Sequence, residues 1–96
     1  MGRTAIHPGE HLAEQLMTLG ISAAELGRRL QVPANRISQI VTGHRAITGD
    51  TALRLGHFFG TGPRFWLNLQ ATYDLNVERD RLQETLDRIE VLRPAS

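Results

Sequence analysis

ISAAELGRRLQVPANRISQIVTG, residues 21–43, is the stretch that decides the predicted fold of this chain. It reads as two short helices joined by a tight turn. Ser22 can cap the first helix by accepting the backbone N–H of Glu25, whose side chain can reach back to Ser22 in a capping box. Val32-Pro33 then interrupts the first helix, since the residue before a proline avoids the α region.

The second predicted helix of this stretch has an inward and an outward face. Its inward apolar side chains are Ile37, Ile40 and Val41. Polar residues spaced four and seven apart share one outward stripe, formed by Asn35, Gln39 and Thr42. Two crossed helices of this kind, ended by Gly43, are typical of a helix-turn-helix, whose second helix enters the DNA major groove. An ordinary pair of helices whose polar stripe faces water remains the alternative.

The remaining chain predicts further helices around this pair. One is expected from Pro8 to Leu19, a second from Gly49 to Phe59 with Thr48 as its cap, and a third from Pro63 with Thr61 as its cap. From Leu75 the residues become charge-rich, with leucine and isoleucine at helical spacing, which predicts an amphipathic C-terminal helix. We therefore expect an all-α fold, with a helix-turn-helix domain over residues 1–76. We expect residues 77–96 to form a helical extension packed on the same domain or on a dimer interface.

Composition limits the classes of protein to which this chain can belong. Ninety-six residues predict one domain, and a chain with 41% hydrophobic residues builds only a small core, so oligomerisation is a sensible supplement. Cysteine is absent, and no apolar run reaches the length of a membrane span or resembles a signal peptide. A cytoplasmic protein without membrane contact is the expectation. His7 and His11 lack a third ligand at zinc-site spacing, so we expect no metal and no cofactor.

Charge is unevenly distributed along the chain. Residues 28–64 carry six arginines and one acid, whereas residues 74–96 carry six acids and four arginines. A basic patch over a helix-turn-helix is the electrostatic pattern expected for contact with DNA phosphates. The alternative to DNA contact is an arginine-rich face that contacts only water.

A broad apolar face is predicted on the helix that follows Pro63. Phe65, Leu69 and Tyr73 fall on one line along this helix. Trp66 widens that line into a broad face. Such a face usually belongs to the core, but four short helices cannot cover all of it. We therefore predict that it forms the dimer surface, with the helix over 75–92 as the second choice.

Several short motifs in order resemble one family. Residues 22–43 resemble the helix-turn-helix of the Cro/C1 (lambda-repressor-like) superfamily. The flanking motifs HPGE at 7–10, RAIT at 45–48 and FWLNLQ at 65–70 narrow the resemblance to HigA antitoxins, also described as the virulence-associated protein I type. The match covers about residues 6–76. Two residues depart from the superfamily pattern: Ala23 replaces a common phosphate-contacting Gln, and Pro33 replaces a common Ser cap.

The resemblance implies a compact five-helix fold and a specific biological role. HigA-like proteins are homodimers that bind a RelE-like ribonuclease toxin, HigB, and keep this mRNA-cleaving enzyme inactive. They also repress their own operon by binding a palindromic operator. No motif indicates which surface would bind the toxin, and no small-molecule ligand is expected.

The candidate DNA contacts follow from side-chain chemistry on and around the second helix. Asn35 and Gln39 are the expected base readers, because an amide can bond both N6 and N7 of adenine, which predicts A·T pairs in the operator. Arg36 is expected at a phosphate more than at a guanine, since most protein–DNA hydrogen bonds go to the backbone. Arg45 and Arg28 are further phosphate contacts. The smaller candidates are Ala34 for a thymine methyl, and Ser38 and Thr42 for a phosphate or a base.

Two other functions compete with the antitoxin role, which the ordered motif set favours. A stand-alone dimeric repressor of the same fold, without a toxin partner, is the alternative that the sequence does not exclude. An enzyme does not, because the chain lacks a nucleophile motif, a phosphate-binding loop and a metal-ligand set. Asp50 is the one acid between Glu25 and Asp74, and it is better explained by the dipole at the start of its helix than by nuclease chemistry.

Overall fold

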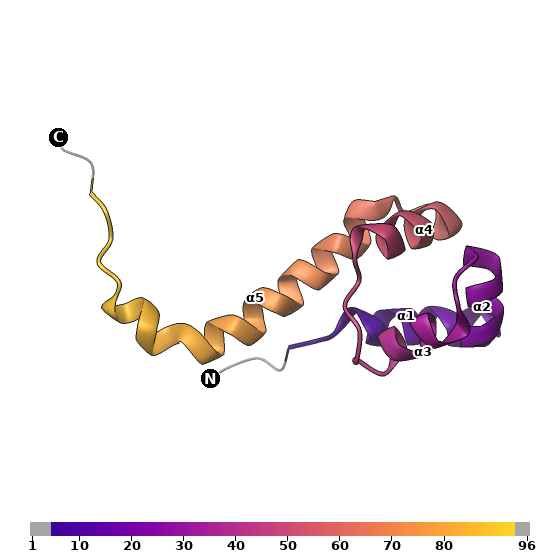
Figure 1. Ribbon diagram of the computed structural model, residues 1–96, viewed down its shortest axis with the longest axis horizontal. Coiled ribbons are helices and arrows are strands. Elements are labelled where there is room, and N and C mark those ends of the chain that lie inside the picture. The colour runs from indigo at the N-terminus through magenta and orange to yellow at the C-terminus, as the bar shows by residue number, and fades with distance from the viewer. Residues whose placement is uncertain (1–4, 94–96) are drawn as a thin grey trace.

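The computed structural model describes residues 5–93, and within them the chain is entirely helical apart from turns and loops. Its five helices are α1 (Pro8–Leu19), α2 (Ala23–Leu30), α3 (Ala34–Val41), α4 (Gly49–Phe59) and α5 (Pro63–Arg88). The first four helices and the start of α5 form a cluster at one end of the molecule (Figure 1). The predicted all-α helix-turn-helix fold is confirmed.

The core lies where the first four helices meet the first turns of α5. Apolar periodicity in each helix supplies it, because residues three and four apart share one face. The buried apolar side chains are Leu12, Leu16, Leu26, Leu30, Ile37, Ile40, Ile47, Ala52, Leu55 and Trp66. All five helices contribute to this one cluster, which therefore holds α2 and α3 in place.

Local capping starts three of the helices. The Nδ1 atom of His7 accepts the backbone N–H of Gly9 at 2.9 Å at the start of α1. Ser22 Oγ accepts the N–H of Glu25 at 3.0 Å, and Thr48 Oγ1 accepts that of Thr51 at 3.5 Å. The predicted caps of α2 and α4 are confirmed.

Two details of the predicted capping are wrong. The Glu25 side chain does not return to Ser22, because it forms ion pairs with Arg28 and Arg29 one turn further along α2. Thr61 does not cap α5, whose N-cap is Gly62 without a side-chain hydrogen bond. Thr61 Oγ1 accepts the indole N–H of Trp66 at 3.1 Å instead.

Close backbone contact joins α1 to α3. A Cβ atom built on Gly9 would lie 1.8 Å from the carbonyl oxygen of Ile40, so only glycine fits at this position. The C-terminal end of α3 is thereby held against the first turn of α1.

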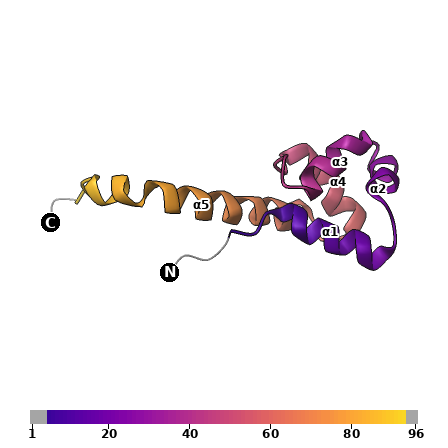
Figure 2. The same cartoon turned by 90° about the horizontal axis from the view of Figure 1, so that it is seen from below.

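The helix α5 is longer than predicted. The expected fifth helix and the expected C-terminal helix are one continuous helix, because residues 64–93 contain no proline or glycine that could interrupt it. Side-chain pairs one turn apart support it, among them Arg81 with Glu78 and Gln83 with Asp87. Its C-terminal half runs away from the other helices in both views (Figures 1 and 2).

Residues 77–88 therefore do not pack on the helix cluster of their own chain. The extension was predicted to pack either on the same domain or on a dimer interface. Packing on a dimer interface stays a prediction. No helix within residues 5–93 is both long enough and apolar enough to cross a membrane.

Candidate nucleic-acid interface

The crossing of α2 and α3 depends on Gly27. A Cβ atom at this position would lie 3.0 Å from the carbonyl oxygen of Val32 and 3.2 Å from the Cα of Ala34. The turn between the helices is further fixed by Gln31, whose backbone is left-handed, and by the bond from Val32 N to Gly27 O at 2.9 Å. These contacts set the angle at which α3 presents its outer face.

The C-terminal end of α3 is closed by a Schellman motif. Gly43 has a φ of 83°, and its N–H donates to the carbonyl oxygen of Ile40 at 3.0 Å. The N–H of His44 donates to the carbonyl oxygen of Gln39 at 2.7 Å. The predicted role of Gly43 as terminator is confirmed, and the chain is directed from here into the segment that carries Arg45.

The predicted stripe lies on the outside of α3. Ala34, Asn35, Ser38 and Thr42 are exposed, and Gln39 is half-buried. The hydroxyl of Ser38 donates to Ala34 O at 3.2 Å, and that of Thr42 donates to Ser38 O at 2.9 Å. Asn35 places its amide side chain at the N-terminal end of α3. Contact of these residues with DNA stays a prediction.

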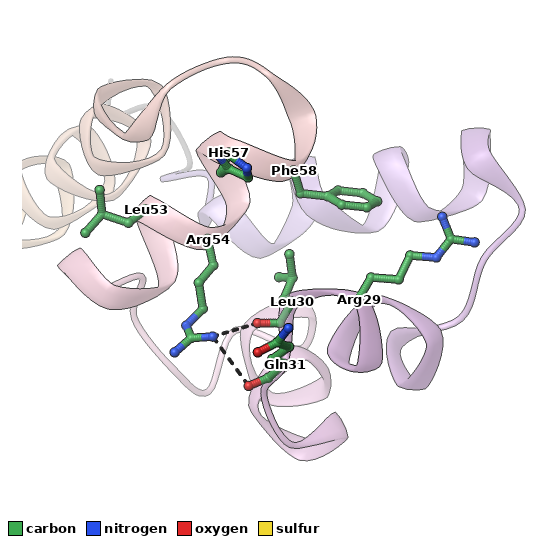
Figure 3. Close-up of a pocket in the computed structure, with 7 residues that line it drawn as sticks. All are labelled: Arg29, Leu30, Gln31, Leu53, Arg54, His57 and Phe58. Atoms are coloured by element: carbon green, nitrogen blue, oxygen red, sulfur yellow. Dashed lines mark hydrogen bonds between the residues drawn. The ribbon is translucent and has the colours of Figure 1, made fainter.

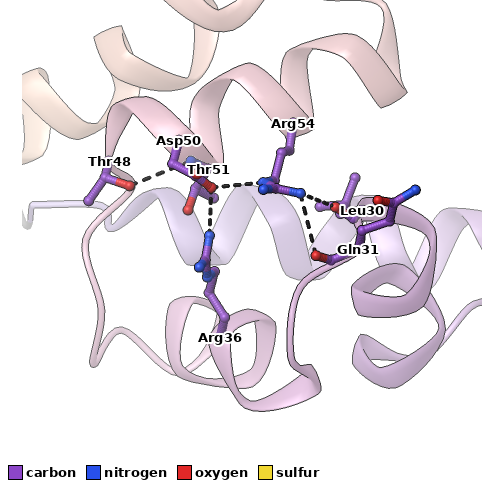
Figure 4. A network of polar contacts seen from close by, with 7 residues as sticks. All are labelled: Leu30, Gln31, Arg36, Thr48, Asp50, Thr51 and Arg54. Atoms are coloured by element: carbon purple, nitrogen blue, oxygen red, sulfur yellow. Dashed lines mark hydrogen bonds and ion pairs between the residues drawn. The ribbon is translucent and has the colours of Figure 1, made fainter.

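Arg36 has a partner within the protein. Its Nη1 atom lies 2.7 Å from Oδ1 of Asp50, and Nε of Arg54 lies 2.8 Å from the same oxygen (Figure 4). Arg54 also donates to the carbonyl oxygens of Leu30, at 2.7 Å, and Gln31, at 3.4 Å. Asp50 therefore links α3 to α4, and Arg54 links α4 to the C-terminal end of α2.

This network changes the interpretation of two predicted residues. The side chain of Arg36 is about three-quarters buried and its Nη1 atom is ion-paired, so Arg36 braces α3 against α4, and its phosphate contact through the other guanidinium nitrogens stays a prediction. Asp50 lies in the first turn of α4, as its predicted dipole role requires, and it also binds two arginines. No sequence signal could have identified these pairs, because Arg36 and Asp50 are fourteen residues apart.

The arginines shift the pKa values of two carboxyl groups. The hydrogen bond from Arg54, followed by that from Arg36, lowers the pKa of Asp50 from its ordinary value of 3.8. The hydrogen bonds from Arg29 and then Arg28 lower the pKa of Glu25 from 4.5. Arg28 remains exposed despite this pairing, so it is still available to a phosphate.

The segment after α3 is anchored from within the protein. The backbone N–H of Ile47 donates to Oε1 of Gln70 on α5 at 2.7 Å, and Gln70 Nε2 donates to Asp74 at 2.9 Å. Nε of Arg45 donates to Oε1 of Gln39 at 2.8 Å. Gln70 belongs to the FWLNLQ motif at 65–70, but its bond to the backbone of Ile47 was not predicted, because the two residues are twenty-three positions apart.

A groove of about 430 Å³ lies between the end of α2 and α4 (Figure 3). The guanidinium group of Arg54 points from α4 to the carbonyl groups of Leu30 and Gln31, and Phe58 lies further along the same helix. Leu53 also lines this groove and is exposed. The lining consists of apolar side chains and cationic or amide groups, without a carboxylate, a hydroxyl or a thiol.

The predicted dimer surface loses one of its four residues. Trp66 is 1% exposed and packs in the core, whereas Phe65 is 37% exposed. Tyr73 and Leu69 are half-buried, and the Tyr73 ring meets the ring of His7 edge-on at 4.9 Å. Including Trp66 was wrong, because it lies one position from Phe65 and the hundred-degree turn per residue directs it inward.

The two N-terminal histidines have structural partners. His7 caps α1, and the ring of His11 packs against Phe65 and Trp66 at centroid distances of 5.2 Å and 5.6 Å. Within residues 5–93, no three His, Cys, Asp or Glu side chains are grouped so that they could hold a metal ion.

Comparison with known proteins identifies close relatives. The helix-turn-helix family profile matches residues 12–66. Virulence-associated protein I of Dichelobacter nodosus is 49% identical over 79 residues, which are 80% of this chain and 73% of that protein. A HigA-family addiction module antidote protein from Coxiella burnetii is 44% identical, with a TM-score of 0.91 over 95% of this chain and 100% of the other. The antitoxin HigA of Pseudomonas aeruginosa, solved with the higBA promoter, is 40% identical, with a TM-score of 0.89 over 94% and 100%.

Proposed function

This chain belongs to the HigA family of helix-turn-helix antitoxins, and from that membership we propose that it neutralises a RelE-like, mRNA-cleaving toxin of the HigB type. In the same proposal, a dimer of the chain represses its own operon by binding a palindromic operator. The observation that carries the DNA-binding half is the exposed outer face of α3, held at a fixed angle by α2, α4 and α1.

The α3 face has the chemistry that base recognition requires. Asn35 is exposed at the N-terminal end of α3, where recognition helices contact base edges. Ala34 is exposed beside it and fits a thymine methyl. Ser38 and Thr42 keep oxygen lone pairs although their protons are donated within α3. Arg28 and Arg45 are exposed on either side and are the proposed phosphate contacts.

Dimerisation follows from the operator geometry. A single domain of this kind covers one half-site, and dimers bind half-sites about one helical turn, roughly 34 Å, apart. We place the dimer surface on α5, at Phe65, Leu69 and Tyr73, with continuation along its outer half. That half exposes apolar side chains, including Val77 at 39% and Leu86 at 45%. A paired α5 would cover them.

The DNA-binding proposal is tested with promoter DNA from upstream of the gene. Asn35→Ala should reduce the preference for promoter over random DNA by about five- to a hundredfold, which corresponds to the loss of one bidentate base contact. Arg28→Ala is the matched control, because loss of a phosphate contact weakens binding to both DNAs. It should also reduce the slope of log K against the logarithm of the salt concentration by about one. Equal effects of both variants on both DNAs would contradict the assignment.

The toxin half is tested by co-expression with the adjacent short reading frame. With a tag on this chain alone, we expect a small protein to co-purify and growth to be rescued from its toxicity. In this proposal the toxin binds a surface other than the DNA face, so Asn35→Ala should rescue growth as well as the wild type. Residues 74–96, with six acids against four arginines, are a sensible contact for a basic ribonuclease.

The alternative function is a stand-alone dimeric repressor. The same α3 face and the same α5 surface support it, since neither depends on a toxin. A neighbouring reading frame that is neither toxic nor bound by this chain, combined with specific promoter binding, would favour this alternative.

A further inference from the structure

Gln39 and Arg45 are hydrogen-bonded to each other across the end of α3. Nε of Arg45 donates to Oε1 of Gln39 at 2.8 Å, although the two residues are six positions apart. Gln39 is half-buried on α3 and Arg45 is exposed in the segment that follows. Both were predicted separately to contact DNA, one at a base and one at a phosphate.

The backbone holds these two residues in this relation. The left-handed Gly43 and the bond from His44 N to Gln39 O reverse the chain immediately after α3. Two residues after Arg45, Ile47 is buried and its N–H is bound to Gln70 on α5 at 2.7 Å. The segment between these two anchors is short, so they hold the backbone of Arg45 beside the C-terminal end of α3, within reach of Gln39.

The chemistry of the contact fixes the orientation of the Gln39 amide. A guanidinium group has only hydrogen-bond donors, so the amide must present its oxygen to Arg45 and turn its NH2 group away. With its oxygen directed at Arg45, Gln39 presents its NH2 donors to a DNA base, and the terminal nitrogens of Arg45 stay free for the proposed phosphate contact. An adenine edge requires one donor and one acceptor from the protein, whereas a guanine edge presents two acceptors, N7 and O6.

We propose that Arg45 is a positioning residue for base specificity, which holds Gln39 as a hydrogen-bond donor so that Gln39 selects guanine instead of the adenine expected from the sequence. This inference rests on the proposed operator binding. Asn35, whose amide is exposed near the other end of α3, keeps its preference for adenine, so each half-site contains one A·T and one G·C pair read by amides.

The test is a binding series with all four bases at each position of the promoter half-site. The base pair that Gln39 reads is identified as the position at which the Gln39→Ala variant loses the preference for one base. Wild-type protein should favour guanine there, by about five- to a hundredfold over adenine. Arg45→Ala should move the preference toward adenine at that position alone, because the amide can then rotate to present its oxygen to N6 and its NH2 group to N7.

Two further variants separate positioning from a phosphate contact. Gln39→Glu keeps an acceptor for Arg45 but has no donor, so the guanine preference should be lost. In a Gln39→Ala background, Arg45→Ala should leave the base preference unchanged. A wild-type preference for adenine, or an Arg45→Ala variant that weakens binding equally for all four bases, would overturn the proposal.

Nuclear magnetic resonance of the free protein tests the contact without DNA. The Nε proton of Arg45 should exchange slowly with solvent, and Gln39→Ala should make it exchange fast; fast exchange in both proteins overturns the pairing. A wild-type protein that binds its promoter no better than random DNA would refute operator binding itself. Specific binding without the guanine preference would refute only the role of Arg45.

Discussion

The side chain of Gln70 on α5 accepts the backbone N–H of Ile47 at 2.7 Å, which ties the longest helix to the segment that follows the recognition helix. Gln70 is 7% exposed and Ile47 is 3% exposed, so this bond is shielded from water. This bond connects the dimer surface proposed on α5 to the chain segment that carries the DNA contact proposed at Arg45.

Replacing Gln70 by leucine should destabilise the protein by about 1–3 kcal/mol, because the buried N–H of Ile47 would lose its partner. Urea unfolding followed by circular dichroism measures this change. Asp74→Asn is the matched control, since an amide oxygen still accepts from Gln70 Nε2 and Asp74 is exposed. Unchanged stability of Gln70→Leu would show that water replaces the glutamine.

Gly9→Ala should cost about 1–3 kcal/mol or more, since the new Cβ would overlap the carbonyl oxygen of Ile40 and force α1 and α3 apart. Gly49→Ala provides the comparison, because it also lies in the first turn of a helix and its Cβ would meet nothing within 4 Å. Its stability should change by less than about 1 kcal/mol. Thermal unfolding of the two variants should therefore differ, and equal melting temperatures would rule out the close contact.

Acid should weaken the link between α3 and α4. The bonds from Arg54 and Arg36 keep the pKa of Asp50 below the value of 3.8 that it has in an unfolded chain, so the folded protein binds this proton less readily. The stabilisation is complete above pH 3.8 and is lost as the pH falls through the lower folded-state pKa.

The measurement is the urea midpoint as a function of pH for wild type and for Asp50→Asn. The variant should be less stable at neutral pH and should lose less stability on acidification. Glu25→Gln removes the contribution of the other carboxyl group with a lowered pKa. Parallel pH profiles for wild type and Asp50→Asn would show that the network adds no stability.

His7→Ala should destabilise the protein by about 0.5–2 kcal/mol, because Gly9 N loses the acceptor that caps α1. The edge-on contact with Tyr73 is lost as well. His7→Asn restores an N-cap acceptor without the ring, so it should recover part of the stability. If His7→Asn were as unstable as His7→Ala in chemical unfolding, the ring contact and not the cap would carry the effect.

Sequence alone determined the parts of this protein that depend on neighbours along the chain. Contacts within about four residues decide where several helices begin and end. They account for the bounds of α1 and α4, the caps at Ser22 and Thr48, and the terminator Gly43. The buried positions Ile37 and Ile40 follow from helical periodicity. The outward stripe of α3 was visible for the same reason, and the family motifs were recognised through their resemblance to HigA antitoxins.

Tertiary structure alone decided which polar groups meet across the fold. Arg36 binds Asp50 from fourteen residues away, and Gln70 reaches Ile47 across twenty-three. The burial of Trp66 and the direction of α5 away from the cluster also required the packed structure. Local propensity sets which backbone conformation a segment adopts, but the partner of a long side chain depends on how the helices pack. The donor orientation of Gln39 belongs to this second class, because it depends on Arg45 returning over the end of α3.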